Sequence, residues 1–134
     1  MVSKRTKLLL CVLLIIAAIM APIRITGGDY IRDALDEWID ELAVYECNGC
    51  PANFRILDRN LRYSYGFWQF QEETFSQYTQ RYGIAKSREE ALAMIYDETV
   101  QRKLVRLMIE ENPNNWKHWA TSVRRGLGEP PQDL

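Results

Sequence analysis

The sequence predicts a mostly helical α+β domain with a small extended piece or hairpin inserted after its first core helix. Apolar residues recur at helical spacing over most of the chain after residue 28. One aromatic stretch, residues 63–71, favours an extended conformation bent at Gly66. Setting aside the first 24 of 134 residues leaves 110, which suits a single domain.

The first core helix is predicted over residues 29–46. Asp29, after two glycines, is its expected N-cap, and Asn48-Gly49 with Pro51 should end it just beyond Glu46. Glu46 therefore belongs to the last turn. The apolar stripe expected to face the core is Ile31, Leu35, Trp38, Ile39, Leu42 and Tyr45.

The rest of the chain should be a loop, the extended piece and further helices. Residues 47–63 are predicted to form an irregular loop, longer than a simple connection needs. The predicted helices run from Glu72 or Thr74 to Tyr82, from Ser87 to Met94, from Asp97 to Glu111 and from Trp116 to Leu127. The expected domain spans residues 29–127, and a polar tail follows over residues 128–134.

The N-terminus resembles an export segment. Three basic residues among the first seven precede an uncharged apolar run from Leu8 to Ala21. That run is shorter than the roughly 20 residues that cross a bilayer as a helix. Because the bulky Ile19 lies two positions before Ala21, cleavage is not assured. Residues 1–24 are predicted to be either a signal peptide or an N-terminal membrane anchor, and the remainder to be exported to the cell envelope.

Charge and cysteine content exclude several classes of function. The formal net charge of −1, from 17 basic and 18 acidic residues, argues against a nucleic-acid partner. Arg55, Arg59 and Arg62 form a local basic cluster that a solvated loop explains as well as an anionic ligand does. Cys47 and Cys50 form a single Cys-x-x-Cys.

A zinc site at this cysteine pair would need two further ligands, and the chain offers one histidine, His118, to which we assign no role. A thioredoxin-type centre would need a strand-helix-strand setting that the pattern lacks. In an oxidising compartment, Cys47 and Cys50 would form a local disulfide that braces the turn after Glu46, with free thiols as the alternative. We expect no metal and no cofactor.

Glu46 is the candidate catalytic residue. Cleavage of a glycosidic bond needs a protonated acid, so the carboxyl must have a raised pKa. The negative end of the helix dipole would raise the pKa of Glu46, as would packing against Tyr45, Tyr65 or Trp68. The alternative is an ordinary exposed helix glutamate.

Two motifs carry a resemblance to a known family. Residues 46–49 (Glu-Cys-Asn-Gly) and 64–70 (Ser-Tyr-Gly-Phe-Trp-Gln-Phe) resemble the lysozyme-like superfamily, closest to lytic transglycosylases and goose-type lysozyme-like domains. In that family the first core helix ends in a catalytic glutamate, commonly Glu-Ser, and a serine and Gly-Leu-Met-Gln follow. Here Cys47 replaces the serine, and Phe67 and Trp68 replace Leu-Met. The family's Ala-Tyr-Asn-Ala-Gly motif is absent.

The resemblance implies roles for individual residues. Glu46 would act as general acid and then as base, and Ser64 would line the site near it. Gln69 would contact the sugar or hold the floor of the groove, although a buried structural amide is an equal alternative. Gly66 would allow a tight backbone approach. The predicted substrate-binding residues are Ser64, Tyr65, Gly66, Trp68 and Gln69.

A second carboxylate is optional in this chemistry. A two-carboxylate glycosidase would need a partner for Glu46 within about 5 to 10 Å, and the sequence cannot place its candidates. Those candidates are Asp58, Glu72, Glu73 and Asp97. The family's transglycosylases use the substrate's own hydroxyl as nucleophile, so we favour a single catalytic glutamate.

The sequence therefore predicts an exported monomeric muramidase, a lytic transglycosylase or a lysozyme, that cleaves the β-1,4 bond between N-acetylmuramic acid and N-acetylglucosamine in peptidoglycan. Its partners would be the glycan strands, and the membrane if the N-terminal segment is uncleaved. One alternative is a non-catalytic wall-binding or envelope-structural module that retains the fold. Another is a membrane-anchored adaptor that binds a protein.

Overall fold

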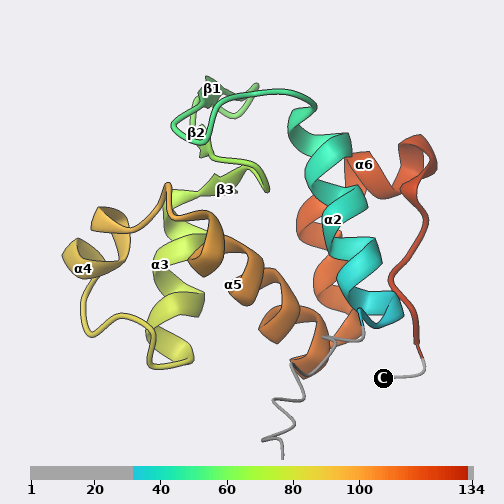
Figure 1. The fold of residues 1–134 in the computed structure, drawn as a ribbon. Helices are drawn as coiled ribbons and strands as arrows, with labels where there is room; N and C mark the ends of the chain where they lie inside the picture. Colours follow the sequence, from blue (N-terminus) through green and yellow to red (C-terminus); the bar gives the residue numbers. More distant parts are fainter. Residues whose placement is uncertain (1–31, 133–134) are drawn as a thin grey trace, which may run out of the picture. The chain divides into compact units, whose positions relative to one another are not determined.

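A computed structural model of the chain describes residues 32–132, which are mostly helical and carry one small antiparallel sheet of three strands (Figure 1). This confirms the predicted class at the level of a mostly helical domain with a small extended insertion. The expected signal or anchor over residues 1–24 lies outside the described residues. Within residues 32–132, no helix is both long and apolar enough to cross a bilayer.

The helices and strands follow one another in the predicted order. They are α2 (Ala34–Cys47), β1 (Arg55–Leu57), β2 (Tyr63–Tyr65), β3 (Phe70–Gln71), α3 (Glu72–Arg81), α4 (Arg88–Ala93), α5 (Glu98–Glu111), the 3₁₀ segment η1 (Pro113–Trp119), α6 (Ala120–Ser122) and the wider π-type turn η2 (Val123–Leu127). The N-cap of α2 is Asp33, whose carboxylate accepts a hydrogen bond from the amide of Asp36 at 2.8 Å. The predicted N-cap, Asp29, lies outside the described residues.

The sheet is larger than predicted. Strand β1 lies inside residues 47–63, which were expected to be wholly irregular, and it pairs with β2 so that Arg55 faces Tyr65 and Leu57 faces Tyr63. All three residues of β1 are exposed, so the strand lacks the apolar alternation that reveals a half-buried strand. Strand β2 also pairs with β3, and the turn between them contains Gly66, as predicted.

The C-terminal segment is not the single helix predicted from Trp116 to Leu127. The 3₁₀ segment η1 begins at Pro113, α6 is three residues long, and η2 contains Gly126 at a φ of 129°. Pro113 explains the early start because its fixed φ suits the first position of a helical turn. Gly126 explains the irregular end because this φ is rarely adopted by other residues.

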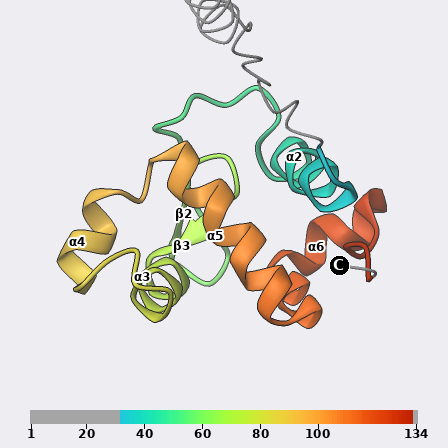
Figure 2. The same cartoon turned by 60° about the horizontal axis from the view of Figure 1, so that its bottom comes forward.

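Helix α5 is the centre of the described domain. Figures 1 and 2 show it between α3 and α4 on one side and α2 and α6 on the other, and it contacts both α2 and α3. Trp38 of α2 is buried, as predicted, and its indole nitrogen donates to the carbonyl of Gly128 at 3.0 Å. The fully buried apolar side chains are Leu35, Ile39, Leu42, Phe75, Ala91, Leu104, Val105, Met108 and Ile109.

Candidate active site

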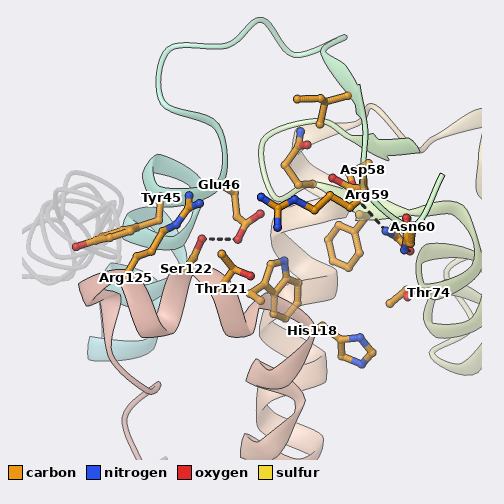
Figure 3. Close-up of a pocket in the computed structure, with 16 residues that line it drawn as sticks. Tyr45, Glu46, Asp58, Arg59, Asn60, Thr74, His118, Thr121, Ser122 and Arg125 are labelled. Carbon is orange, nitrogen blue, oxygen red and sulfur yellow. Dashed lines mark hydrogen bonds between the residues drawn. The ribbon is translucent and has the colours of Figure 1, made fainter. Parts of the chain in front are cut away.

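A groove with a volume of about 720 Å³ lies where the C-terminal end of α2 faces the sheet and the C-terminal helical turns (Figure 3). Four segments line it: the end of α2, the hairpin of β1 and β2, the stretch from the β2–β3 turn into α3, and the stretch from η1 to η2. The lining residues are Tyr45, Glu46, Ile56, Asp58, Arg59, Asn60, Ser64, Gln69, Phe70, Gln71, Thr74, His118, Trp119, Thr121, Ser122 and Arg125.

Glu46 lies in the last turn of α2, where the sequence predicted it, and is half-buried at the groove. Its Oε1 accepts a hydrogen bond of 2.5 Å from the hydroxyl of Ser122 (Figure 3). Burial is the largest influence and raises the pKa of Glu46, and the negative charge of Asp58 adds to this increase. The Ser122 hydrogen bond and the positive charge of Arg125 act in the opposite direction.

No basic residue lies in the last turn of α2, so this helix end offers no compensating positive charge of its own. The outcome is a carboxyl with a raised pKa and its Oε1 bonded to a neutral hydroxyl. Such a group can hold a proton at a higher pH than a free glutamate can. This is the property that a general acid requires.

Asp58 is the second carboxylate of the groove. It follows β1, and its Oδ2 accepts hydrogen bonds from the Ser64 hydroxyl and, at 3.0 Å, from the side-chain amide of Gln71. Both donors come from neighbouring strands, so the sheet fixes the position of this carboxylate. Of the four carboxylates considered as partners of Glu46, Asp58 is the one that lines the groove.

The other three carboxylates lie elsewhere. Glu72 and Glu73 line a separate hollow on the sheet together with Arg88, and Asp97 caps α5 by accepting from the amide of Val100 at 3.0 Å.

The turn between β2 and β3 presents Gln69 to the groove. Gln69 has a φ of 51°, a left-handed conformation that is uncommon for a residue other than glycine. Its side-chain amide nitrogen donates to the carbonyl of Gly66 at 2.6 Å and to the sulfur of Cys47 at 3.8 Å. The amide nitrogen of Gln69 therefore has the structural role considered above, because it ties the turn together. Gln69 also lines the groove.

Gly66 keeps this turn against the core. Its φ is 70°, and a Cβ added there would lie 2.3 Å from the side-chain nitrogen of Gln101. Gln101 is buried in α5 and donates to the carbonyl of Tyr65 at 3.0 Å, while its oxygen accepts from the amide of Trp68 at 3.2 Å. The close approach predicted for Gly66 is thus made to Gln101, and Gly66 does not line the groove.

Tyr65 and Trp68 are also absent from the groove, which differs from their predicted place in substrate binding. Trp68 is 2 % exposed, and its indole nitrogen donates to the carbonyl of Ile39 at 2.9 Å. Tyr65 is buried, and its hydroxyl donates to Glu72 at 2.7 Å on the side of the separate hollow. Trp68 ties the turn to α2 and, through its backbone amide, to Gln101 of α5, whereas the Tyr65 ring packs against Tyr96.

Cys47 and Cys50 form a disulfide directly after Glu46. Cys47 is the last residue of α2 and is buried, so the disulfide joins the helix end to the loop that leads to β1. This is the bracing arrangement that the sequence suggested. Within residues 32–132, no group of three or more histidine, cysteine, aspartate or glutamate residues is suited to hold a metal ion.

The groove also contains residues that the sequence did not indicate. Ser122 and Arg125 contribute to the electrostatics of Glu46, yet they lie more than 70 residues further along the chain, in a segment whose irregular turns were not foreseen. His118, to which no role was assigned, lies in the groove lining, and burial lowers its pKa. No periodicity or motif could have linked these residues to Glu46.

Comparisons of the chain with protein-family models, with curated proteins and with solved structures give no match.

Proposed function

We propose that this domain is an exported muramidase that cleaves the β-1,4 bond between N-acetylmuramic acid and N-acetylglucosamine in peptidoglycan, with Glu46 as its catalytic acid. One observation carries the proposal: Glu46 is half-buried, has a raised pKa and shares a groove with Ser64 and Gln69. These are the three polar residues to which the resemblance assigns the catalytic and substrate-lining positions. Export is supported by the N-terminal sequence.

In the proposed reaction, protonated Glu46 donates its proton to the oxygen that bridges the two sugars. The bond from that oxygen to the anomeric carbon breaks, and positive charge develops on the sugar ring. The resulting Glu46 carboxylate then accepts a proton from the incoming nucleophile. Ser122 is a suitable partner in this cycle because its hydroxyl stabilises the carboxylate form by the hydrogen bond to Oε1.

Two nucleophiles are compatible with the groove. The substrate's own hydroxyl would give an anhydro sugar, as in a transglycosylase, whereas water would give a hydrolysed end, as in a lysozyme. Asp58 faces the same groove as Glu46 and is fixed by Ser64 and Gln71, so it is suited to stabilise the developing positive charge or to orient a water. The mass of the product separates the two outcomes, because the anhydro product is lighter by one water.

The test is release of soluble fragments from insoluble peptidoglycan by the full chain and by Glu46→Gln. We expect the substitution to lower the rate by about 10²- to 10⁴-fold, the usual contribution of a general acid. Glu41→Gln is the matched control, since Glu41 is an exposed glutamate on the same helix and does not line the groove. Circular dichroism of both variants reports whether the fold is intact.

Full activity in Glu46→Gln would remove Glu46 from the reaction. Wild-type protein that binds the wall without releasing fragments would instead favour the non-catalytic wall-binding module.

A further inference from the structure

The arginines of the described domain fall into two groups. Five of the ten arginines in residues 32–132 form ion pairs with carboxylates: Arg32, Arg81, Arg88, Arg102 and Arg106. The other five form no ion pair within these residues. Those five are Arg55, Arg59, Arg62, Arg124 and Arg125.

The paired arginines lie at the start of α2 and on α3, α4 and α5, whereas the unpaired ones lie on the hairpin of β1 and β2 and on η2. These are two of the segments that line the groove, and one unpaired arginine from each, Arg59 and Arg125, is among its lining residues. Figure 3 shows their side chains on either side of Glu46 in that view. The groove is therefore flanked by two guanidinium groups that form no ion pair within residues 32–132.

An excess of basic residues does not explain this arrangement. Residues 32–132 contain 13 basic and 16 acidic residues, a formal charge of 13 − 16 = −3. The domain contains more carboxylates than arginines, yet only five of its ten arginines form an ion pair within these residues. The two carboxylates within the groove, Glu46 and Asp58, are bonded instead to the neutral donors Ser122, Ser64 and Gln71.

A guanidinium group presents a planar fork of donors that matches the two oxygens of a carboxylate or phosphate. We propose that Arg59 and Arg125 bind anionic substituents carried by the glycan strand, so that the groove selects glycans bearing free carboxylates or phosphates over neutral glycans. This inference rests on the proposed function and specifies its substrate class. Two members of the basic cluster noted in the sequence lie at different sites: Arg59 lines the groove, and Arg62 lines the separate hollow.

An anion bound to Arg125 would also affect the protonation of Glu46. The positive charge of Arg125 lowers the pKa of Glu46, which opposes the effect of burial. An anionic group bound to Arg125 would offset that charge, and the carboxyl of Glu46 would then hold its proton more strongly. Binding of the correct substrate would thereby favour the protonated acid.

The chain offers a closely matched control. Arg62 and Arg124 lie on the same two segments as Arg59 and Arg125, are exposed and unpaired, and do not line the groove. The double variants Arg59→Gln/Arg125→Gln and Arg62→Gln/Arg124→Gln therefore lose the same formal charge. We would measure their binding to insoluble peptidoglycan in the Glu46→Gln background, which prevents cleavage during the assay.

We expect the groove pair to bind about tenfold more weakly than the parent protein, because each exposed ion pair typically contributes a factor of up to about five. The control pair should change binding by less than about twofold. Two treatments of the wall identify the anion: conversion of its carboxylates to amides, and removal of its phosphate polymers. The treatment that removes the bound anion should weaken binding of the parent protein. It should also abolish the difference in binding between the two double variants. Equal loss of binding in both pairs, or unchanged binding in the groove pair, would overturn the proposal.

Failure of this inference can be told from failure of the proposed function. If the protein with native Glu46 releases fragments while the groove pair retains full binding, the muramidase proposal stands and the anion assignment is wrong. If that protein releases none while the groove pair still loses binding selectively, the anion assignment stands and the domain is a binding module.

Discussion

The two ends of helix α2 place a carboxylate in opposite surroundings. Near the N-terminal end, Asp36 is 1 % exposed, and one of its oxygens pairs with Arg102 at 2.9 Å and with Arg106 at 3.0 Å. At the C-terminal end, Glu46 is half-buried, forms no ion pair within the described residues and accepts its hydrogen bond from a serine. The helix dipole favours a negative charge at the first end and disfavours it at the second.

The difference separates a structural carboxylate from the proposed catalytic one. Asp36 joins α2 to α5 through two guanidinium groups and has little access to solvent. Burial and the negative charge of Asp58 disfavour the charged form of Glu46, which lines an open groove. A site of this kind costs stability, which the well-packed end of the same helix can offset.

The largest effect on stability should come from Asp36→Ala. Arg102 and Arg106 would lose their shared buried carboxylate and keep only more exposed partners. We expect a loss of about 3 kcal/mol in the free energy of unfolding, the lower end of the range for broken buried ion pairs. Urea denaturation at neutral pH measures it. A loss below about 1 kcal/mol would show that the Asp36 cluster is not what fixes α2 on α5.

Glu46→Gln provides the contrast in the same experiment. The pKa of Glu46 is raised in the folded protein, so protonated Glu46 contributes to the stability of wild type. This contribution is complete below the ordinary glutamate pKa and is lost as the pH rises through the raised pKa. Glutamine carries no such dependence. The variant should therefore be at least as stable as wild type at neutral pH and gain no advantage in acid.

A smaller effect is expected where α5 holds the turn of the site. Gly66→Ala would place a methyl group against Gln101 at a positive φ, and we expect a loss of about 2 kcal/mol together with lower activity, since the turn carries Gln69. Gly83→Ala is the matched control: its φ is 68°, but no atom lies within 4 Å of the added Cβ. It should cost about 1 kcal/mol and leave activity unchanged. Equal stability losses in the two variants would mean that contact with Gln101 contributes nothing.

The smallest effect is a shift in the pH dependence of activity. Ser122 lowers the pKa of Glu46 by its hydrogen bond, so Ser122→Ala should raise that pKa further. Activity that depends on protonated Glu46 falls as the pH rises through the pKa. The falling limb of the pH profile should therefore move to higher pH in Ser122→Ala, and a shift to lower pH would contradict the assigned role of Ser122.

Local patterns predicted the helices well because α2, α3, α4 and α5 each have an apolar face, and α4 and α5 begin within one residue of their predicted starts. The position of Glu46 at a helix end followed from the Asn48-Gly49 signal. Strand β1 could not be predicted because it is exposed on both faces.

The composition of the site was harder to predict because it depends on contacts between distant segments. Trp68 is buried against α2, and Tyr65 is buried beside Tyr96 and Glu72. No residue pattern specifies these contacts. The same is true of the hydrogen bond between Ser122 and Glu46, which joins residues 76 positions apart. Sequence motifs thus indicated the candidate acid, and tertiary packing determined its neighbours.

The most direct test of the account is a titration of the side-chain carboxyls of Glu46 and Asp33 by ¹³C NMR. Asp33 caps the opposite end of α2, and its hydrogen bonds to Arg106 and to the amide of Asp36 lower its pKa from 3.8 to about 2. Glu46 should titrate above the ordinary glutamate value of 4.5, with burial as the cause. If Glu46 titrates at or below that value, the groove does not hold a protonated acid and the muramidase proposal loses its basis.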